Sequence, residues 1–207
     1  MTDGLGIYVA ASLALILTPG QDMLYVISRS LAQGRAAGVY SAIGVILGIL
    51  VHTALAAFGV GAILAASEGL FLLLKLVGAA YLLYLGLRLM FSRTQDVGLA
   101  TGGNAMRPAS LVWQGLLSNV TNPKIVLFFF AFLPQFVDPA SAHPTRDLIF
   151  LGVLYAALGL PVKVGVGLAA GSLAHVFRAR PQVLAWVNRA SGLVLVALGL
   201  RLAATER

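Results

Sequence analysis

Six apolar stretches, each long enough to cross a lipid bilayer, take up most of this chain. A helix needs about 20 consecutive apolar residues to span the hydrocarbon core of a membrane. Of the 207 residues, 59% are apolar and 10% are charged, and the mean hydropathy is +0.94. We therefore expect an all-α polytopic membrane protein with six transmembrane helices, which cover residues 4–31, 39–66, 70–91, 111–136, 148–177 and 184–204.

The positive charge of the chain lies mainly in loops and predicts how the helices are oriented. The net charge is +7, but membrane proteins carry an excess of Lys and Arg in cytoplasmic loops, so we expect no nucleic-acid binding. Trp113 and Trp186 also open spans on the more basic side. We expect this side to be cytoplasmic and both termini to face away from it. Its arginines are Arg29, Arg35, Arg88, Arg93, Arg107, Arg178, Arg180 and Arg189.

Two pairs of matching segments indicate an internal repeat. LTPGQDMLYV in the first span resembles VTNPKIVLFF in the fourth, and the third span ends in YLGLRLMF where the sixth ends in ALGLRLAA. Each half holds three spans, so the second copy must enter the membrane from the opposite side. We expect two inverted three-helix repeats, residues 1–98 and 111–207, joined by a loop over 99–110, with the first and fourth helices broken. Secondary transporters use this arrangement.

Both predicted breaks combine a proline with a charge. Asp22 lies three residues after Pro19, and Lys124 directly follows Pro123. A charge at mid-helix costs about 2.5–3.5 kcal/mol on insertion scales, so it usually faces a cavity or a partner. Proline interrupts the helix, and the half-helix that follows presents N–H groups that favour a carboxylate. We expect Asp22 to bind the ammonium and Lys124 the carboxylate of an amino acid, in a site made by Thr18, Pro19, Gly20, Gln21, Asp22, Asn119, Asn122, Pro123 and Lys124.

The residues alone leave several roles of these charges open. Asp22 and Lys124 could form a structural ion pair with each other. Asp22 could also couple transport to protons: ionised, it would bind the substrate ammonium from the cytoplasm, and an external proton would then displace the substrate. His52, near the centre of the second span, is a second proton-coupling candidate, and Lys163 is a candidate for the cavity wall. The commoner alternatives are a packing histidine and a lysine that reaches the membrane surface.

Three segments resemble the signature segments of the LysE/RhtB family of amino-acid exporters. They are LTPGQDMLYV, KLVGAAYLLYLGLRLM and NPKIVLFFFAFLPQFV, and the resemblance covers nearly the whole chain. The homoserine/threonine branch is the most similar. This resemblance implies export of small neutral amino acids, homoserine, threonine or leucine across the bacterial inner membrane by proton antiport. The family's break motifs fall on Thr18, Pro19, Gly20 and Asp22 and on Asn122, Pro123 and Lys124, while Gln21 stands where many relatives have a second proline.

Other classes of function fit the sequence less well. We find no acidic ring or filter loop of an ion channel, no G-x-S-x-G or H-E-x-x-H motif, and no second acid to pair with Asp22. We expect no enzymatic activity and no cofactor. The main alternative is an exporter of another small metabolite or of a cation, although a chain without cysteine and with Asp22 as the one acid well inside a span makes a poor metal site. Assembly into a homo-oligomer is left open.

Overall fold

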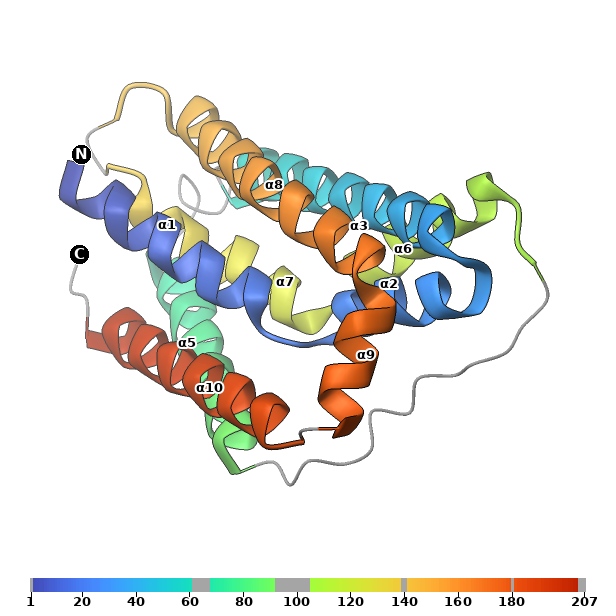
Figure 1. Cartoon of the computed structure of the whole chain (residues 1–207). Coiled ribbons are helices and arrows are strands. Elements are labelled where there is room, and N and C mark those ends of the chain that lie inside the picture. The colour runs from blue at the N-terminus through green and yellow to red at the C-terminus, as the bar shows by residue number, and fades with distance from the viewer. Residues whose placement is uncertain (1, 61–67, 92–104, 139–140, 180, 205–207) are drawn as a thin grey trace.

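The computed structural model describes residues 2–60, 68–91, 105–138, 141–179 and 181–204, and the regular structure in these ranges is helical (Figure 1). The first predicted span comprises α1 (Thr2–Leu17) and α2 (Gln21–Gln33), the second α3 (Arg35–Leu55) with the π-helix η1 (Ala56–Val60), and the third α5 (Glu68–Phe91). The fourth comprises α6 (Pro108–Val120), α7 (Pro123–Leu127), the π-helix η2 (Phe128–Phe132) and the 3-10 helix η3 (Leu133–Phe136). The fifth comprises α8 (Pro144–Leu168) and α9 (Ala170–Ala179), and the sixth is α10 (Pro181–Ala204).

These helices have the length and apolar character of a polytopic membrane protein. Within the described residues, 3 unbroken helices could cross a membrane, and the two bent helix pairs raise that number to 5. α5 is not among them, but its 24 residues would extend about 36 Å at the usual rise per residue. The predicted all-α membrane fold is confirmed. The number of six spans and the inverted repeat stay predictions.

Both predicted helix breaks are present, and each lies at its proline. α1 and α2 meet at 46°, and α6 meets the segment from α7 to η3 at 54°. At the first break, the hydroxyl of Thr18 turns back and donates to the Ala14 carbonyl at 2.6 Å. At the second, Asn122 is extended and caps α7, because its Oδ1 accepts from the Lys124 N–H at 3.1 Å. The chain therefore leaves and re-enters the helical conformation at the bend of each of these helix pairs.

Glycines allow two pairs of helices to approach closely. α3 packs antiparallel against α8, and α5 packs antiparallel against α10 (Figure 1). A Cβ added to Gly38 would lie 2.9 Å from Gly167 Cα, and one added to Gly86 would lie 2.7 Å from the Gly192 carbonyl oxygen. Small residues serve this purpose in membrane helices. The second and fifth spans are thus partners, as are the third and sixth, and the other ends of these contacts are Thr53 with Gly152 and Ala79 with Gly199.

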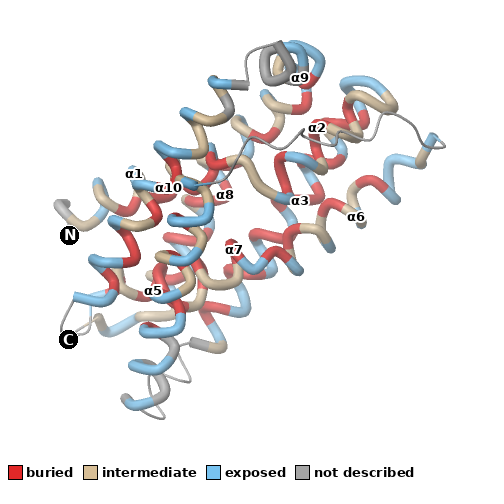
Figure 2. Tube along the Cα trace, turned by 90° about the horizontal axis from the view of Figure 1, so that it is seen from below, coloured by how far each residue is buried: buried red, intermediate tan, exposed pale blue. Residues whose placement is uncertain are grey.

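The outer surface of the helices keeps many large apolar side chains. Buried residues lie on the faces that helices turn toward one another, and exposed residues lie on the outside (Figure 2). Phe58, Trp113 and Leu193 are 70%, 60% and 60% exposed. Soluble monomers rarely expose apolar surface on this scale. The lipid bilayer is therefore the environment to which this surface is suited.

Gly44 provides a test of the helix packing. It lies against the backbone of α6, where an added Cβ would be 2.1 Å from the Val112 carbonyl oxygen. We expect Gly44→Ala to destabilise the protein by about 1–3 kcal/mol, the usual range for overpacking, seen as a lower midpoint of thermal unfolding in detergent. Gly165→Ala in α8 is the matched control, since nothing lies within 4 Å of its added Cβ. Equal midpoints would contradict this packing.

Candidate functional site

The ammonium of Lys124 completes the C-terminal end of α1. In an unbroken helix the N–H of residue 19 would bond to the Leu15 carbonyl, but Pro19 has no N–H. Lys124 Nζ instead donates to the carbonyls of Leu15 and Thr18, both at 3.2 Å. The negative end of the α1 dipole also favours a cation at this position. The first break is therefore satisfied by a side chain from the second.

His52 has the corresponding place at the second break. Pro123 removes the helical partner of the Asn119 carbonyl. His52 Nε2, from α3, lies 3.3 Å from that oxygen, and the backbone N–H of Asn122 donates to it at 2.9 Å. At each break, the carbonyl that proline leaves without a helical donor is thus contacted by a nitrogen-bearing side chain from another helix.

Asp22 connects the first break to the second. It lies in the first turn of α2, is 3% exposed, and its Oδ2 accepts from Asn119 Nδ2 at 2.8 Å. The positive end of the α2 dipole stabilises a carboxylate there. Gly48 of α3 leaves the space that Asn119 occupies, because an added Cβ would lie 2.7 Å from Asn119 Oδ1. Asp22, Asn119 and His52 therefore form a continuous set of contacts across three helices.

Three buried charged side chains gather around these contacts. Lys124 and Lys163 are 8% and 5% exposed, and the charges of Lys124, Lys163 and Asp22 act on one another. Asp22 and Lys124 do not bond to each other, because Asp22 bonds to Asn119 and Lys124 to backbone carbonyls. The ion pair considered from the sequence is not observed. The central cluster is the set Asp22, His52, Asn119, Asn122, Lys124 and Lys163.

Lys163 enters this cluster from α8 and is the member with the fewest polar contacts. It is buried rather than extended to the membrane surface. No hydrogen bond of its ammonium occurs within the described part of the chain. Counted by formal charge, with Asp22 ionised, both lysines protonated and His52 neutral, the cluster carries one negative and two positive charges. This excess of positive charge favours an anionic group as an additional partner.

Four polar atoms of the central cluster are buried without a hydrogen-bond partner in the described residues. Asp22 Oδ1 and Asn119 Oδ1 are acceptors, Asn122 Nδ2 is a donor, and His52 Nδ1 is either, according to its tautomer. Buried polar atoms in proteins are nearly always hydrogen-bonded. Their concentration in one cluster is suited to a ligand that carries both donors and acceptors.

The other residues expected in the site lie at its edge. Thr18 is buried, but its hydroxyl is bonded within α1. Gly20 lies beside Lys124, and a Cβ there would be 3.2 Å from Nζ. Gln21 is exposed, and its Nε2 donates to the Ser118 carbonyl at 3.2 Å. Gln21 therefore joins the two breaks from the outer side and is not part of the buried cluster.

Two features of the site were not singled out from the sequence. The Leu15 carbonyl is the acceptor for Lys124, and its signal was its place four residues before Pro19. Gly48 holds open the space for Asn119, and nothing in the sequence distinguishes it from glycines that serve helix packing alone. Both features act through backbone geometry and not through a chemical side chain.

Comparison with known proteins identifies the family. A family model described as LysE type translocator matches residues 13–206. This chain belongs to that family. The membership confirms the resemblance drawn from the three motifs, and the family is defined by translocation. No solved structure matches the chain.

Curated relatives cover almost the whole chain. An uncharacterized membrane protein of Pseudomonas aeruginosa is 36% identical over 203 residues, which are 95% of this chain and 93% of that protein. An uncharacterized membrane protein of Vibrio cholerae is 30% identical over 199 residues, 96% of each chain. A leucine efflux protein of Salmonella typhimurium is 26% identical over 199 residues, 96% of this chain and 94% of that protein.

A double-mutant cycle tests the role of Lys124 at the end of α1. Lys124→Met removes the donor to the Leu15 carbonyl, and we expect a loss of about 1–3 kcal/mol for the buried acceptor left unsatisfied. Pro19→Ala returns an N–H to position 19. In the Pro19→Ala background the loss caused by Lys124→Met should therefore be smaller, because the Leu15 carbonyl has its helical partner again. Thermal unfolding of the four proteins in detergent measures the coupling, and strictly additive losses would contradict it.

Proposed function

We propose that this protein is a secondary active transporter that exports a neutral amino acid from the cytoplasm and binds it in the central cluster. The observation that carries the proposal is the set of buried polar atoms without partners. Asp22 Oδ1 and Asn119 Oδ1 offer two acceptors, and Asn122 Nδ2 offers a donor in the same cluster as two buried ammonium groups. A zwitterion needs acceptors at one end and donors at the other.

Each charged end of the substrate has its own partners in this proposal. Asp22 and Asn119 bind the ammonium, while Lys163, Lys124 and Asn122 bind the carboxylate. Binding a zwitterion brings a carboxylate to a cluster that has an excess of positive charge. A cation, the alternative considered from the sequence, would add to that excess. The charge balance therefore favours an amino acid over a metal ion.

The relatives support a substrate with an apolar side chain. Proteins of similar length and about a quarter identical are named leucine efflux proteins, among them those of Salmonella typhimurium and of an Enterobacter strain. Aromatic and aliphatic residues are packed beside the central cluster, where Phe129 lies 5.8 Å from the His52 ring. Leucine is therefore the first amino acid to assay, followed by threonine and homoserine.

The proposed cycle alternates access to the cluster across the bacterial inner membrane. The units 1–98 and 111–207 rock against each other as inverted repeats, with both termini on the non-cytoplasmic side. Ionised Asp22 binds the substrate ammonium from the cytoplasm. A proton from outside then protonates Asp22 and releases the substrate. His52 is the second proton-coupling group, because Asn119 links it to Asp22.

Exchange of radiolabelled leucine in proteoliposomes tests this function. We expect Asp22→Asn to lower exchange at least ten-fold and to abolish accumulation driven by a proton gradient, because the variant removes the partner of the ammonium and the proton acceptor together. Ser28→Ala in the same helix should keep both activities, since the Ser28 hydroxyl bonds only to carbonyls of its own helix. Undiminished proton-coupled exchange in Asp22→Asn would overturn the proposed mechanism.

A further inference from the structure

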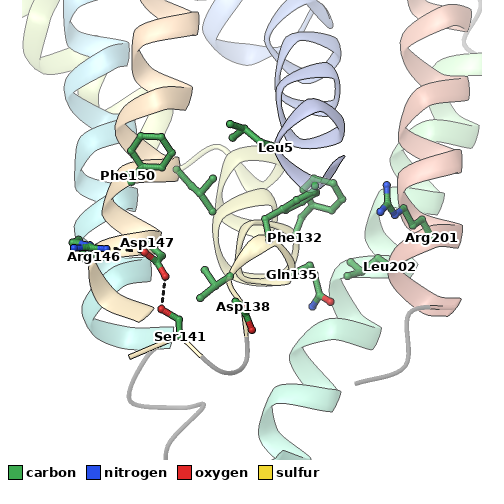
Figure 3. A pocket seen from close by; sticks show the side chains of 14 residues that line it. Leu5, Phe132, Gln135, Asp138, Ser141, Arg146, Asp147, Phe150, Arg201 and Leu202 are labelled. Carbon is green, nitrogen blue, oxygen red and sulfur yellow. Dashed lines mark hydrogen bonds and ion pairs between the residues drawn. The ribbon is translucent and has the colours of Figure 1, made fainter. Parts of the chain in front are cut away.

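A cavity lies at the end of the molecule where α1 begins and α10 ends. Its volume is about 630 Å³, within the range of small-molecule sites. It is lined by α1, the segment from η2 to η3, the start of α8 and the end of α10 (Figure 3). We call this space the outer cavity, and the residues that matter below are Leu5, Phe132, Asp138, Asp147, Phe150 and Arg201.

The outer cavity is separate from the central cluster. Leu5 precedes Leu17, the last residue of α1, by a distance of about 18 Å along the helix axis at the usual rise per residue. A layer of aromatic side chains fills the space between them. Phe128 and Tyr155, 0% and 1% exposed, have ring centroids 4.8 Å apart. In this structure the two sites are therefore closed off from each other.

The same aromatic layer connects the two sites physically. Phe129 packs on His52 of the central cluster at 5.8 Å and on Tyr155 at 5.4 Å. Phe128 packs on Phe132 at 5.3 Å, and Phe132 lines the outer cavity. Because η2 (Phe128–Phe132) supplies these three phenylalanines directly after α7, a movement of the second break would shift the layer. A substrate that leaves the cluster past this layer would enter the outer cavity.

The walls of the outer cavity match both parts of an apolar amino acid. Leu5, Phe132 and Phe150 form an apolar surface (Figure 3). Arg201 lies on one side of the space, and Asp147 lies on the other beside Arg146, whose Nε is 4.0 Å from Asp147 Oδ1. Asp147 is held in place, because its Oδ2 accepts from the Ser141 hydroxyl at 2.5 Å. A guanidinium on one side of an apolar surface and carboxylates on the other match the two charged groups and the side chain of an apolar amino acid.

We propose that the outer cavity is a second amino-acid site, occupied by the substrate after it leaves the central cluster. The proposal rests on the proposed function. Arg201 binds the carboxylate, Asp147 and Asp138 bind the ammonium, and the side chain lies on Phe132 and Phe150. Because this site lies beyond the aromatic layer, it binds its ligand whether or not the central cluster is intact.

A fluorescent reporter tests this site directly. Trp113 and Trp186 lie near the starts of α6 and α10, away from the outer cavity, and are 60% and 69% exposed. We would replace both by Phe and introduce Phe150→Trp, so that the emission reports only on the outer cavity. Purified protein in detergent is then titrated with L-leucine, and we expect a saturable change in emission. Val153→Trp in the same background is the control and should not respond, since Val153 does not line the cavity.

The proposed site predicts two further results of this titration. The response should persist when Asp22→Asn disables the central cluster, and Arg201→Gln should weaken leucine binding at least ten-fold. Two leucine analogues test the same recognition without altering the protein. Leucinol, which lacks the carboxylate, and 4-methylpentanoate, which lacks the ammonium, should each bind at least ten-fold more weakly than leucine.

Each contrary outcome has a distinct meaning. No response to leucine by a protein that still exchanges leucine in proteoliposomes overturns the outer site and leaves the proposed function intact. A response lost in Asp22→Asn also overturns it, because the reporter would then be sensing the central cluster. Equal binding of 4-methylpentanoate, inorganic phosphate and leucine would assign the cavity to anions such as lipid headgroups. Absence of both exchange and response would remove the proposed function as well.

Discussion

The contact between Lys124 and the Leu15 carbonyl is the interaction on which the interior of this protein depends. Proline deletes one backbone donor inside a span, and the bilayer contains no water to replace it. A buried ammonium from the other half of the chain supplies the missing hydrogen bond. The same bond gives the ammonium a partner in a medium where an isolated charge is costly. The Leu15 carbonyl thus gains a donor, and the ammonium of Lys124 gains an acceptor.

The second break follows the same logic with different groups. His52 contacts the Asn119 carbonyl, which Pro123 deprives of its α-helical donor. The side chain of Asn119 binds Asp22. Asn119 therefore contributes its backbone carbonyl to the second break and its side-chain amide to Asp22 at the first break. Gly48 makes this double role possible by leaving space for the side chain. Uncharged residues, namely Gly48 and the two prolines, therefore determine the positions of the charged side chains Asp22 and Lys124.

Sequence reasoning could locate the breaks but not the partners inside them. Pro19 and Pro123 act on their own helices, so both breaks follow from local chemistry. Asp22 and Lys124 were expected inside the membrane, and both are buried among the helices of the protein. Their mutual ion pair is absent because each has a closer partner. One of these partners is the Leu15 carbonyl, which only its position four residues before Pro19 could have indicated. Gln21, adjacent to Asp22, lies outside the cluster because neighbouring positions on a helix point in different directions.

The outer cavity and the aromatic layer were beyond sequence reasoning for a related reason. Three parts of the chain that are far apart in sequence, residues 4–5, 132–151 and 201–202, contribute the residues that line the cavity, so no local motif marks it. The π-helical turn of η2 sets the directions of Phe128, Phe129 and Phe132, and a run of phenylalanines reads equally well as ordinary membrane-facing sequence. Only the packing of Tyr8 and Tyr155 against this run gives it a position in the interior.

The bond from Lys124 to the Leu15 carbonyl also has a consequence for the proposed transport cycle, in which Lys124 binds the substrate carboxylate. One ammonium cannot serve a backbone oxygen and an incoming carboxylate equally well at the same moment. Arrival of a substrate would therefore draw the lysine away and leave the last turn of α1 loosened, whereas departure would let that turn tighten again. Binding of a substrate in the central cluster would in this way affect α1 as far as its opposite end, because the substrate and the Leu15 carbonyl compete for the single nitrogen atom Nζ of Lys124.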